Sequence, residues 1–432
     1  MKKILSAVAA FGLVAGVASV ATAAEFSVTG SYVVEGIYVN NAGDAADART
    51  IAGGANPFYE TGSDAYWMHT FQMLPTMKVN DNVTMKSDIR LRKEARFGVE
   101  TEDTGNATGD AHGVDVNKIY MEYASPVGKF TVGRTPAGAW GGPFLNSATA
   151  ANRVMFAPTL SKPWSMLVYT QKSQERDSQT TNSNVDQDTD QYHVGVGYTT
   201  DDAKLAVGYF HNRNVGNLNV DDYQLDVDGM IKFGGRYTLF GEYAHIGGEQ
   251  ATNVDYDADG LCLHLAANFD ALTLHAAYVY ASGDDANSAD QEGLMNKTGG
   301  LGKDFQPLYI FTGDAMHILN QDEKSGSSAN VAAADAGVHA FALMADYKVS
   351  DRLTLHGAVA YGKADETNNY GNNVDDSFGM EYNVGAAYKL LDNLTYEAHF
   401  GYVDAGDFFQ LGDATADIQD ITVLSHSLTM NF

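Results

Sequence analysis

Apolar and polar side chains alternate along one segment of this chain after another. In residues 25–39, Phe26 and Tyr32 lie on the apolar parity. Ser27 and Glu35 lie on the polar parity of the same segment. The alternation recurs in residues 223–233 and 261–269 and continues to the C-terminus. A period of two places successive side chains on opposite faces of a strand, so the sequence predicts an all-β fold.

The connections between these segments alternate between short and long. Eight short polar turns lie at residues 80–82, 125–128, 161–163, 201–202, 234–235, 270–271, 350–352 and 392–393. Long hydrophilic stretches include residues 40–64, 100–113, 136–152, 175–190, 282–335 and 364–376. Eight turns pair sixteen strands, and an unpaired first and last strand raise the predicted count to eighteen, with sixteen as the alternative.

An even number of strands with both ends on the short-turn side suits a closed antiparallel barrel in a membrane. Segments of about 9 to 12 residues are long enough for a tilted strand to cross a bilayer. Closure leaves no unpaired sheet edge in lipid. We therefore predict a transmembrane antiparallel β-barrel with short periplasmic turns and long extracellular loops. The alternative, an exported soluble β-sandwich or propeller, would not sort its loops so consistently by length.

Composition excludes several other classes of protein. Apolar residues make up 44% of the 432 residues, which is too many for a disordered chain. No run of 18 apolar residues follows the N-terminus, so a helical membrane protein is excluded. The net charge of −28 argues against nucleic-acid binding, because a phosphate backbone requires a basic surface.

Both ends of the chain carry signals for export and assembly. A positive start at residues 1–3 leads into an apolar core and then into small residues at 21–23. This is the pattern of a cleaved signal peptide over residues 1–23, which leaves residues 24–432 as a single barrel domain. The last segment alternates to the end and closes on Phe432.

The segment Val132-Gly133-Arg134-Thr135-Pro136-Ala137-Gly138 continues through a Gly-rich stretch to Phe144. Together with the terminal Phe432 and the repeated strand–turn–strand phrases at residues 347–355 and 388–396, it resembles porins of the general Gram-negative type. In these porins a strand that ends in Gly-Arg leads into a loop that folds into the barrel and narrows it. The resemblance implies a water-filled channel in the cell outer membrane for passive diffusion of small hydrophilic solutes and ions.

The resemblance also implies partners and loop roles. Outer-membrane lipid and lipopolysaccharide would surround the barrel, and the barrel assembly machinery would recognise Phe432. The barrel would be a monomer or a homotrimer. Residues 136–152 are the candidate constriction loop, and the alternative is an outer loop packed over a neighbouring subunit. Residues 282–335 are a long extracellular loop that either caps the mouth or folds inward. No cofactor is expected.

The strand predicted at residues 83–97 carries the charges most informative about selectivity. Its polar parity holds Lys86, Asp88, Arg90, Arg92, Glu94 and Arg96. Such a row of cations is costly against lipid, so it is predicted to face the water of the lumen. Two interpretations stay open: a wall neutralised by its own acids, or a basic ladder that faces acids across the channel.

The predicted acidic side of the lumen consists of Asp226, Asp228, Glu242, Glu381 and Glu397, and Lys118 and Glu122 complete the candidate pore-lining set. Opposed charged rows would set up a transverse field in a narrow channel. Arg134 falls on the apolar parity of its strand. The resemblance implies that Arg134 lines the pore through a bulge at Gly133, and the alternative is a charge at the headgroup rim.

Other chemistry is weakly indicated. Asp255, Asp257 and Asp259 open like a calcium loop, but the twelfth position is Ala266 rather than an acid. Five histidines on the inward parity are predicted to be plain wall residues: His193, His264, His275, His356 and His399. No nucleophile–base motif, haem site or phosphate-binding loop occurs, so no enzyme is predicted. The functional alternatives are a substrate-specific channel for anionic solutes and a barrel sheath that encloses a partner such as a cytochrome.

Overall fold

The computed structural model describes residues 24–40, 50–51, 54–55, 63–97, 114–138, 140–145, 150–175, 188–214, 220–251, 254–298, 300–302, 305–312, 318–319, 334–371 and 373–432. For residues 50–51, 54–55, 64, 92–96 and 214 it describes the backbone alone. The predicted signal peptide, residues 1–23, lies outside these ranges, so its cleavage stays a prediction.

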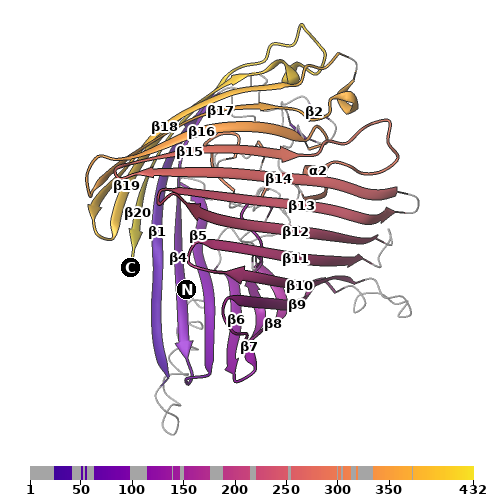
Figure 1. Cartoon of the computed structure of the whole chain (residues 1–432). Coiled ribbons are helices and arrows are strands. Elements are labelled where there is room, and N and C mark those ends of the chain that lie inside the picture. The colour runs from indigo at the N-terminus through magenta and orange to yellow at the C-terminus, as the bar shows by residue number, and fades with distance from the viewer. Residues whose placement is uncertain are drawn as a thin grey trace.

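Eighteen strands within these ranges form one antiparallel sheet. They are β1 (Glu25–Val39), β4 (Asp64–Lys78), β5 (Val83–Arg96), β6 (Val114–Ser125), β7 (Gly128–Pro136), β8 (Ala150–Pro158), β9 (Trp164–Gln174), β10 (Thr189–Thr199), β11 (Ala203–Asn214), β12 (Val220–Phe233), β13 (Tyr237–Ala251), β14 (Val254–Phe269), β15 (Leu272–Ala281), β16 (Val338–Lys348), β17 (Leu353–Lys363), β18 (Ser377–Leu391), β19 (Leu394–Ala405) and β20 (Ile421–Asn431). Each strand pairs with its neighbours in the sequence, and β1 pairs with both β4 and β20 (Figure 1). The predicted closed barrel of eighteen strands is confirmed.

The eight predicted short turns join consecutive strands at one end of the barrel. The connections at the other end are longer, with two exceptions: residues 215–219 join β11 to β12, and residues 252–253 join β13 to β14. Seven of these eighteen strands are longer than the predicted 9 to 12 residues, and the lengths run from 9 residues in β7 to 16 in β14. A strand continues through polar residues as long as its neighbour still pairs with it. The cross-strand pair of Asp221 and Glu249 is an example.

The two faces of the strands differ as the alternation requires. Large apolar side chains such as Leu343 and Val384 are about three-fifths exposed on the outer surface. On the inward parity, Ala342, Ala360 and Val403 are buried. An apolar outer surface suits a lipid environment, because lipid tails make no hydrogen bonds.

The C-terminal residue seals the joint between the first and last strands. The backbone of Phe432 exchanges two hydrogen bonds with Gly30, at 2.9 and 3.0 Å. Its ring stacks on Phe71 of β4 at a centroid distance of 5.7 Å. Phe432, which directly follows β20, therefore contacts both β1 and β4 where the barrel closes.

The remaining elements are short. They are the hairpin β2 (Thr50–Ile51) and β3 (Gly54–Ala55), the helix α2 (Leu294–Thr298) and two 3-10 turns, η2 (Asn368–Tyr370) and η3 (Asp407–Gln410). In the part of the chain that the structure describes, no helix has the length and apolar character needed to span a membrane.

Candidate functional site

The chain after β7 turns into the barrel and packs on its inner wall. Trp140 lies against β10 and β11, where Gly195 and Gly208 form a cross-strand pair. A Cβ atom at Gly195 would lie 2.4 Å from Cε2 of Trp140, and one at Gly208 would lie 2.6 Å from Cδ1. Because these separations are far below van der Waals contact, only glycine leaves room for the indole.

Glu242 on β13 binds the same loop. Its carboxylate Oε2 accepts a hydrogen bond from the backbone N–H of Phe144 at 3.1 Å. The ring of Phe144 is fully buried and meets Phe305 edge to face at 5.6 Å between centroids. The N–H of Gly302 donates to the carbonyl of Phe144 at 2.7 Å. The described part of residues 136–152 is thus held between the wall and a second loop, and its role as the constriction stays a prediction.

The second loop lies between β15 and β16 and is anchored on β18. The carboxylate of Glu381 accepts the backbone N–H groups of Tyr309, Ile310 and Phe311 at 2.7, 2.9 and 2.8 Å. The hydroxyl of Tyr309 also bonds to Ser425 on β20. The sequence left open whether this loop caps the mouth or folds inward. Its residues 305–312 pack against the inner wall.

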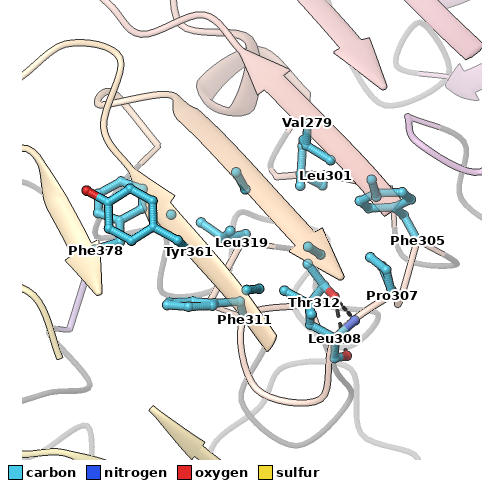
Figure 2. A pocket seen from close by; sticks show the side chains of 15 residues that line it. Val279, Leu301, Phe305, Pro307, Leu308, Phe311, Thr312, Leu319, Tyr361 and Phe378 are labelled. Carbon is cyan, nitrogen blue, oxygen red and sulfur yellow. Dashed lines mark hydrogen bonds between the residues drawn. The ribbon is translucent and has the colours of Figure 1, made fainter. Parts of the chain in front are cut away.

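Apolar side chains complete the contact between the second loop and the wall. Figure 2 shows Leu301, Phe311 and Leu319 of the loop together with Val279 and Phe378 of the wall around a cavity of about 30 Å³. A cavity of this size holds no more than one or two water molecules. The loop is therefore packed like a core segment.

Asp88 on β5 collects polar partners on another part of the wall. Gln72 and Asn117 donate to its two oxygens at 2.8 and 2.9 Å. Arg90 and Lys118 approach the same carboxylate at 3.5 and 3.6 Å. Asp88 is only 3% exposed, so this carboxylate is a structural centre of the wall and presents little charge to water.

Glu122 on β6 is shared in the same way. Lys86 approaches it at 2.8 Å and Lys129 at 3.1 Å. With Arg90 and Lys118 at Asp88, four cations share two carboxylates among the described side chains of this wall. This geometry favours the neutralised wall. The side chains of Arg92, Glu94 and Arg96 lie outside the described residues.

Arg153 on β8 is a functional residue that sequence reasoning missed. Its guanidinium donates to the carbonyl oxygens of Ala137 and Pro136, at 2.5 and 3.4 Å, and so fixes the start of the first inward loop. Its Nε donates to Gln171 at 2.8 Å, and its guanidinium carbon lies 4.1 Å from the ring centroid of Tyr169. The signal available in the sequence was a cation on the inward parity of a strand made mostly of small and apolar residues.

The predicted acidic side of the lumen needs correction. Asp226, Asp228, Glu242 and Glu381 are at most 2% exposed. Glu242 and Glu381 are covered by the two inward loops, and Asp228 binds Lys204 at 2.7 Å. These four acids therefore do not form a water-facing row opposite the basic wall. Glu397 is half-buried on the inward parity of β19.

Arg134 does not line the pore. It pairs with Ile119 of β6, which is 50% exposed on the outer face. The register between β6 and β7 runs without a shift through Gly133, so the bulge that the pore-lining interpretation needs is absent from this described pair of strands. Arg134 lies on the outward parity and donates to the carbonyl of Asn117 at 2.8 Å.

The calcium-loop interpretation of Asp255, Asp257 and Asp259 is also wrong. All three lie inside β14, where the extended backbone places them on one outward face rather than around an ion. Asp259 pairs with His245 of β13 at 3.1 Å. Ligand atoms of His245, Asp257 and Asp259 lie within 4.8 Å of one another, so these groups meet on the outer surface.

The loop around α2 contains carboxyl groups outside the strands. Burial raises the pKa of Asp335, and the nearby charge of Asp284 adds to the shift, while a hydrogen bond from Asn296 opposes it. In the connection between β17 and β18, burial also raises the pKa of Glu366, with a further contribution from Asp365. Both carboxyl groups therefore favour their neutral forms more than exposed acids do.

A closed barrel with an apolar exterior and loops packed inside it defines the class of outer-membrane β-barrel channels. The profile of the Gram-negative porin family matches residues 6–367, and the chain belongs to this family. No curated protein sequence gives a significant match.

Several solved structures share this fold. OccK5 (OpdH) of Pseudomonas aeruginosa is 13% identical with a TM-score of 0.54, over 94% of this chain and 98% of that one. A BenF-like porin from Pseudomonas fluorescens is 13% identical with a TM-score of 0.55, over 94% and 99%. OccAB2 of Acinetobacter baumannii is 13% identical with a TM-score of 0.55, over 94% and 98%. At this identity the likeness establishes the fold.

Proposed function

We propose that this protein is an outer-membrane porin through which small hydrophilic solutes and ions diffuse passively. The observation that supports this function best is the division of the inner wall. Two inward loops are anchored at Glu242 on β13 and Glu381 on β18. On β5–β7 the side chains of Lys86 and Lys129 keep 39% and 54% of their surface exposed. A lumen narrowed on one side and polar on the other suits hydrated solutes.

A substrate-specific channel for anionic solutes is the second candidate. It draws support from the four cations gathered around Asp88 and Glu122. The same ion pairs weaken it, because each carboxylate already occupies two cations. The sheath has less support, since loops of this chain occupy inner surface that an enclosed partner would need.

Assembly and processing belong to the same proposal. We infer that residues 1–23 are removed on export and that the assembly machinery recognises Phe432. The apolar outer face would contact lipid and lipopolysaccharide. The number of barrels in the assembly, one or three, is an outcome to be measured by crosslinking in native membranes.

The proposal is tested on purified barrel in planar bilayers of neutral lipid and in liposome-swelling assays. We expect stable conductance in KCl, and swelling rates that fall with sugar size without saturation. Heat-denatured protein is the control, and the native form should migrate differently from it on a gel. Saturable inhibition by one class of anion would favour the second candidate. A barrel that does not conduct and co-purifies with a partner would favour the sheath, and a protein soluble without detergent would contradict the whole proposal.

A further inference from the structure

Histidines from four strands meet on one part of the inner wall. His264 on β14, His275 on β15, His356 on β17 and His399 on β19 join Asp346 on β16, and we call these five residues the histidine row. The sequence analysis predicted these histidines to be plain wall residues, because they fall on different strands without the spacing of metal ligands. The barrel brings them together because neighbouring strands are about 4.8 Å apart.

A chain of hydrogen bonds connects four of the five residues. Nε2 of His264 lies 3.0 Å from Nδ1 of His275, whose Nε2 lies 3.2 Å from Asp346. Nδ1 of His356 lies 2.6 Å from the other oxygen of Asp346. An ionised carboxylate only accepts hydrogen bonds, so both histidines bonded to Asp346 donate to it. In its neutral form His356 then carries its lone pair on Nε2, and His275 carries it on Nδ1.

Gly385 on β18 brings His399 into the row. The cross-strand register places His356, Gly385 and His399 side by side on three neighbouring strands. A Cβ atom at Gly385 would lie 2.3 Å from Nδ1 of His399, so the missing side chain leaves space for this nitrogen. The rings of His356 and His399 are nearly parallel, with 6.4 Å between centroids. Tyr309 of the second inward loop stacks on His399 at 5.1 Å.

The histidine row is open to a cavity. A space of about 380 Å³ is lined by all five residues of the row and by Asn383, next to residues 305–309 of the second inward loop. The side chains of His275 and His356 are 19% and 38% exposed. An ion in the lumen can therefore reach these imidazoles without unfolding of the wall.

We propose that the histidine row binds divalent transition-metal ions that prefer imidazole nitrogen, such as Zn²⁺ and Ni²⁺. Imidazole is a preferred ligand of these metals, whereas Mg²⁺ and Ca²⁺ prefer oxygen. A carboxylate that accepts from one ring nitrogen orients the imidazole and raises the basicity of the other nitrogen. Asp346 has this relation to both His275 and His356. The proposal requires the fold and not the conduction of solutes, so it goes beyond the proposed function.

Two neighbouring pairs of imidazoles supply the ligands. His264 and His275 form one pair, and His356 and His399 form the other across Gly385. Each pair offers two nitrogens, and water completes the coordination of the metal. Such incomplete sites bind weakly and exchange readily, which suits a surface that ions pass.

The first test is Zn²⁺ binding by the detergent-solubilised barrel, measured by equilibrium dialysis at pH 7.5. We expect the His264→Gln/His275→Gln/His356→Gln/His399→Gln quadruple variant, which lacks both pairs, to lower the affinity at least tenfold, with Mg²⁺ in excess having no effect on the wild type. The His426→Gln control, on the outward parity of β20, should bind like the wild type. Equal Zn²⁺ affinity in the quadruple variant and the wild type would overturn the proposal.

Two further variants separate the row from other sites and from misfolding. Asp257→Asn disrupts the outward group of His245, Asp257 and Asp259, and it should leave lumen binding intact. Gly385→Ala keeps every histidine but places a methyl group against His399, so it should weaken binding in a barrel that still shows heat-modifiable migration. Binding lost in Asp257→Asn and kept in Gly385→Ala would assign the metal to the outer surface and refute the proposal.

The second test is conductance in planar bilayers. Zn²⁺ should reduce KCl conductance at concentrations at least tenfold below those of Mg²⁺, and acidification should weaken this inhibition because protons compete for the imidazole nitrogens. Wild-type conductance in KCl alone reports on the channel itself, so failure of the proposed function would be distinguished from failure of the metal site. Inhibition that is equal for both metals would count against the histidine row.

Discussion

Substitution of Glu381 by Gln should release the second inward loop from the wall. The carboxylate is fully buried and accepts three backbone N–H groups, from Tyr309, Ile310 and Phe311. Oε1 takes two of these bonds and a third from Asn383 at 3.0 Å, whereas Oε2 takes the bond from Phe311. In Gln the carbonyl oxygen replaces Oε1, because that position receives the donors. The NH₂ group then faces the N–H of Phe311.

The cost follows from these bonds. An unsatisfied buried N–H at Phe311 costs about 1–3 kcal/mol. The two remaining backbone bonds change from charge-assisted to neutral, which loses about 1 kcal/mol each. The sum is about 3–5 kcal/mol, so the local opening equilibrium of residues 305–312 should rise by roughly a hundredfold to several thousandfold. In the open state, water can satisfy the N–H group that Gln leaves without an acceptor. Opening the loop is therefore less costly in the variant than in the wild type.

Hydrogen exchange followed by mass spectrometry measures this opening in detergent. Amides in peptides that cover residues 305–312 should exchange at least a hundredfold faster in Glu381→Gln, and single-channel conductance should rise with larger fluctuations. Glu397→Gln is the matched control, since it removes an equal charge from a half-buried inward position on β19. Exchange in residues 305–312 that is unchanged in Glu381→Gln, or accelerated equally in both variants, would refute the anchoring role of Glu381.

Four further outcomes are expected. Gly208→Val should displace the indole of Trp140, which packs on this glycine, and increase the quenching of tryptophan fluorescence by iodide. An unchanged quenching constant would contradict the packing of Trp140 on Gly208. Deletion of Phe432 should sharply reduce heat-modifiable barrel in the membrane fraction while synthesis continues, because the joint of β1, β4 and β20 loses its two backbone bonds and a stacked ring. Arg90→Gln with Lys118→Gln should shift the reversal potential toward cations; no shift would mean that the wall is fully neutralised. The raised pKa of Asp335 means that the loop around α2 should lose stability as pH rises from the ordinary aspartate value through the raised one, so its hydrogen exchange, corrected for intrinsic rate, should be slower at pH 4 than at pH 7.

The barrel could be predicted from sequence because lipid and water impose opposite requirements on alternate residues. Val384 and Leu343 must be apolar outside, and the turns must be polar, so strand number and turn positions are written locally in the chain. The strand ends were less predictable. A strand such as β14 continues beyond its apolar part because its neighbour β13 still offers backbone partners, and no local pattern records that.

The lumen was much harder to predict because parity specifies a face and not the neighbours on it. Parity placed Glu242 and Glu381 inward, but it could not indicate that backbone N–H groups about 70 to 100 residues away in the chain would cover them. Parity also placed His356 and His399 inward, but it could not indicate that they meet across Gly385. Arg134 was misassigned for a different reason: the family resemblance suggested a bulge that the register of β6 and β7 does not contain.

The distribution of acids explains why a net charge of −28 is a poor guide to the lumen. Glu242 and Glu381 lie beneath loops, where they accept backbone hydrogen bonds. Asp257 and Asp259 face the outer surface of β14, and at physiological salt the field of exposed charges decays within about 8 Å. On β5 to β7, four cations lie within 3.6 Å of Asp88 or Glu122. Counted from β5, β14 is nine strands away in the ring of eighteen, so the basic wall faces the first strand of the histidine row. The lumen wall on these strands therefore presents ammonium, guanidinium and imidazole groups, while Glu242 and Glu381 are covered by loops.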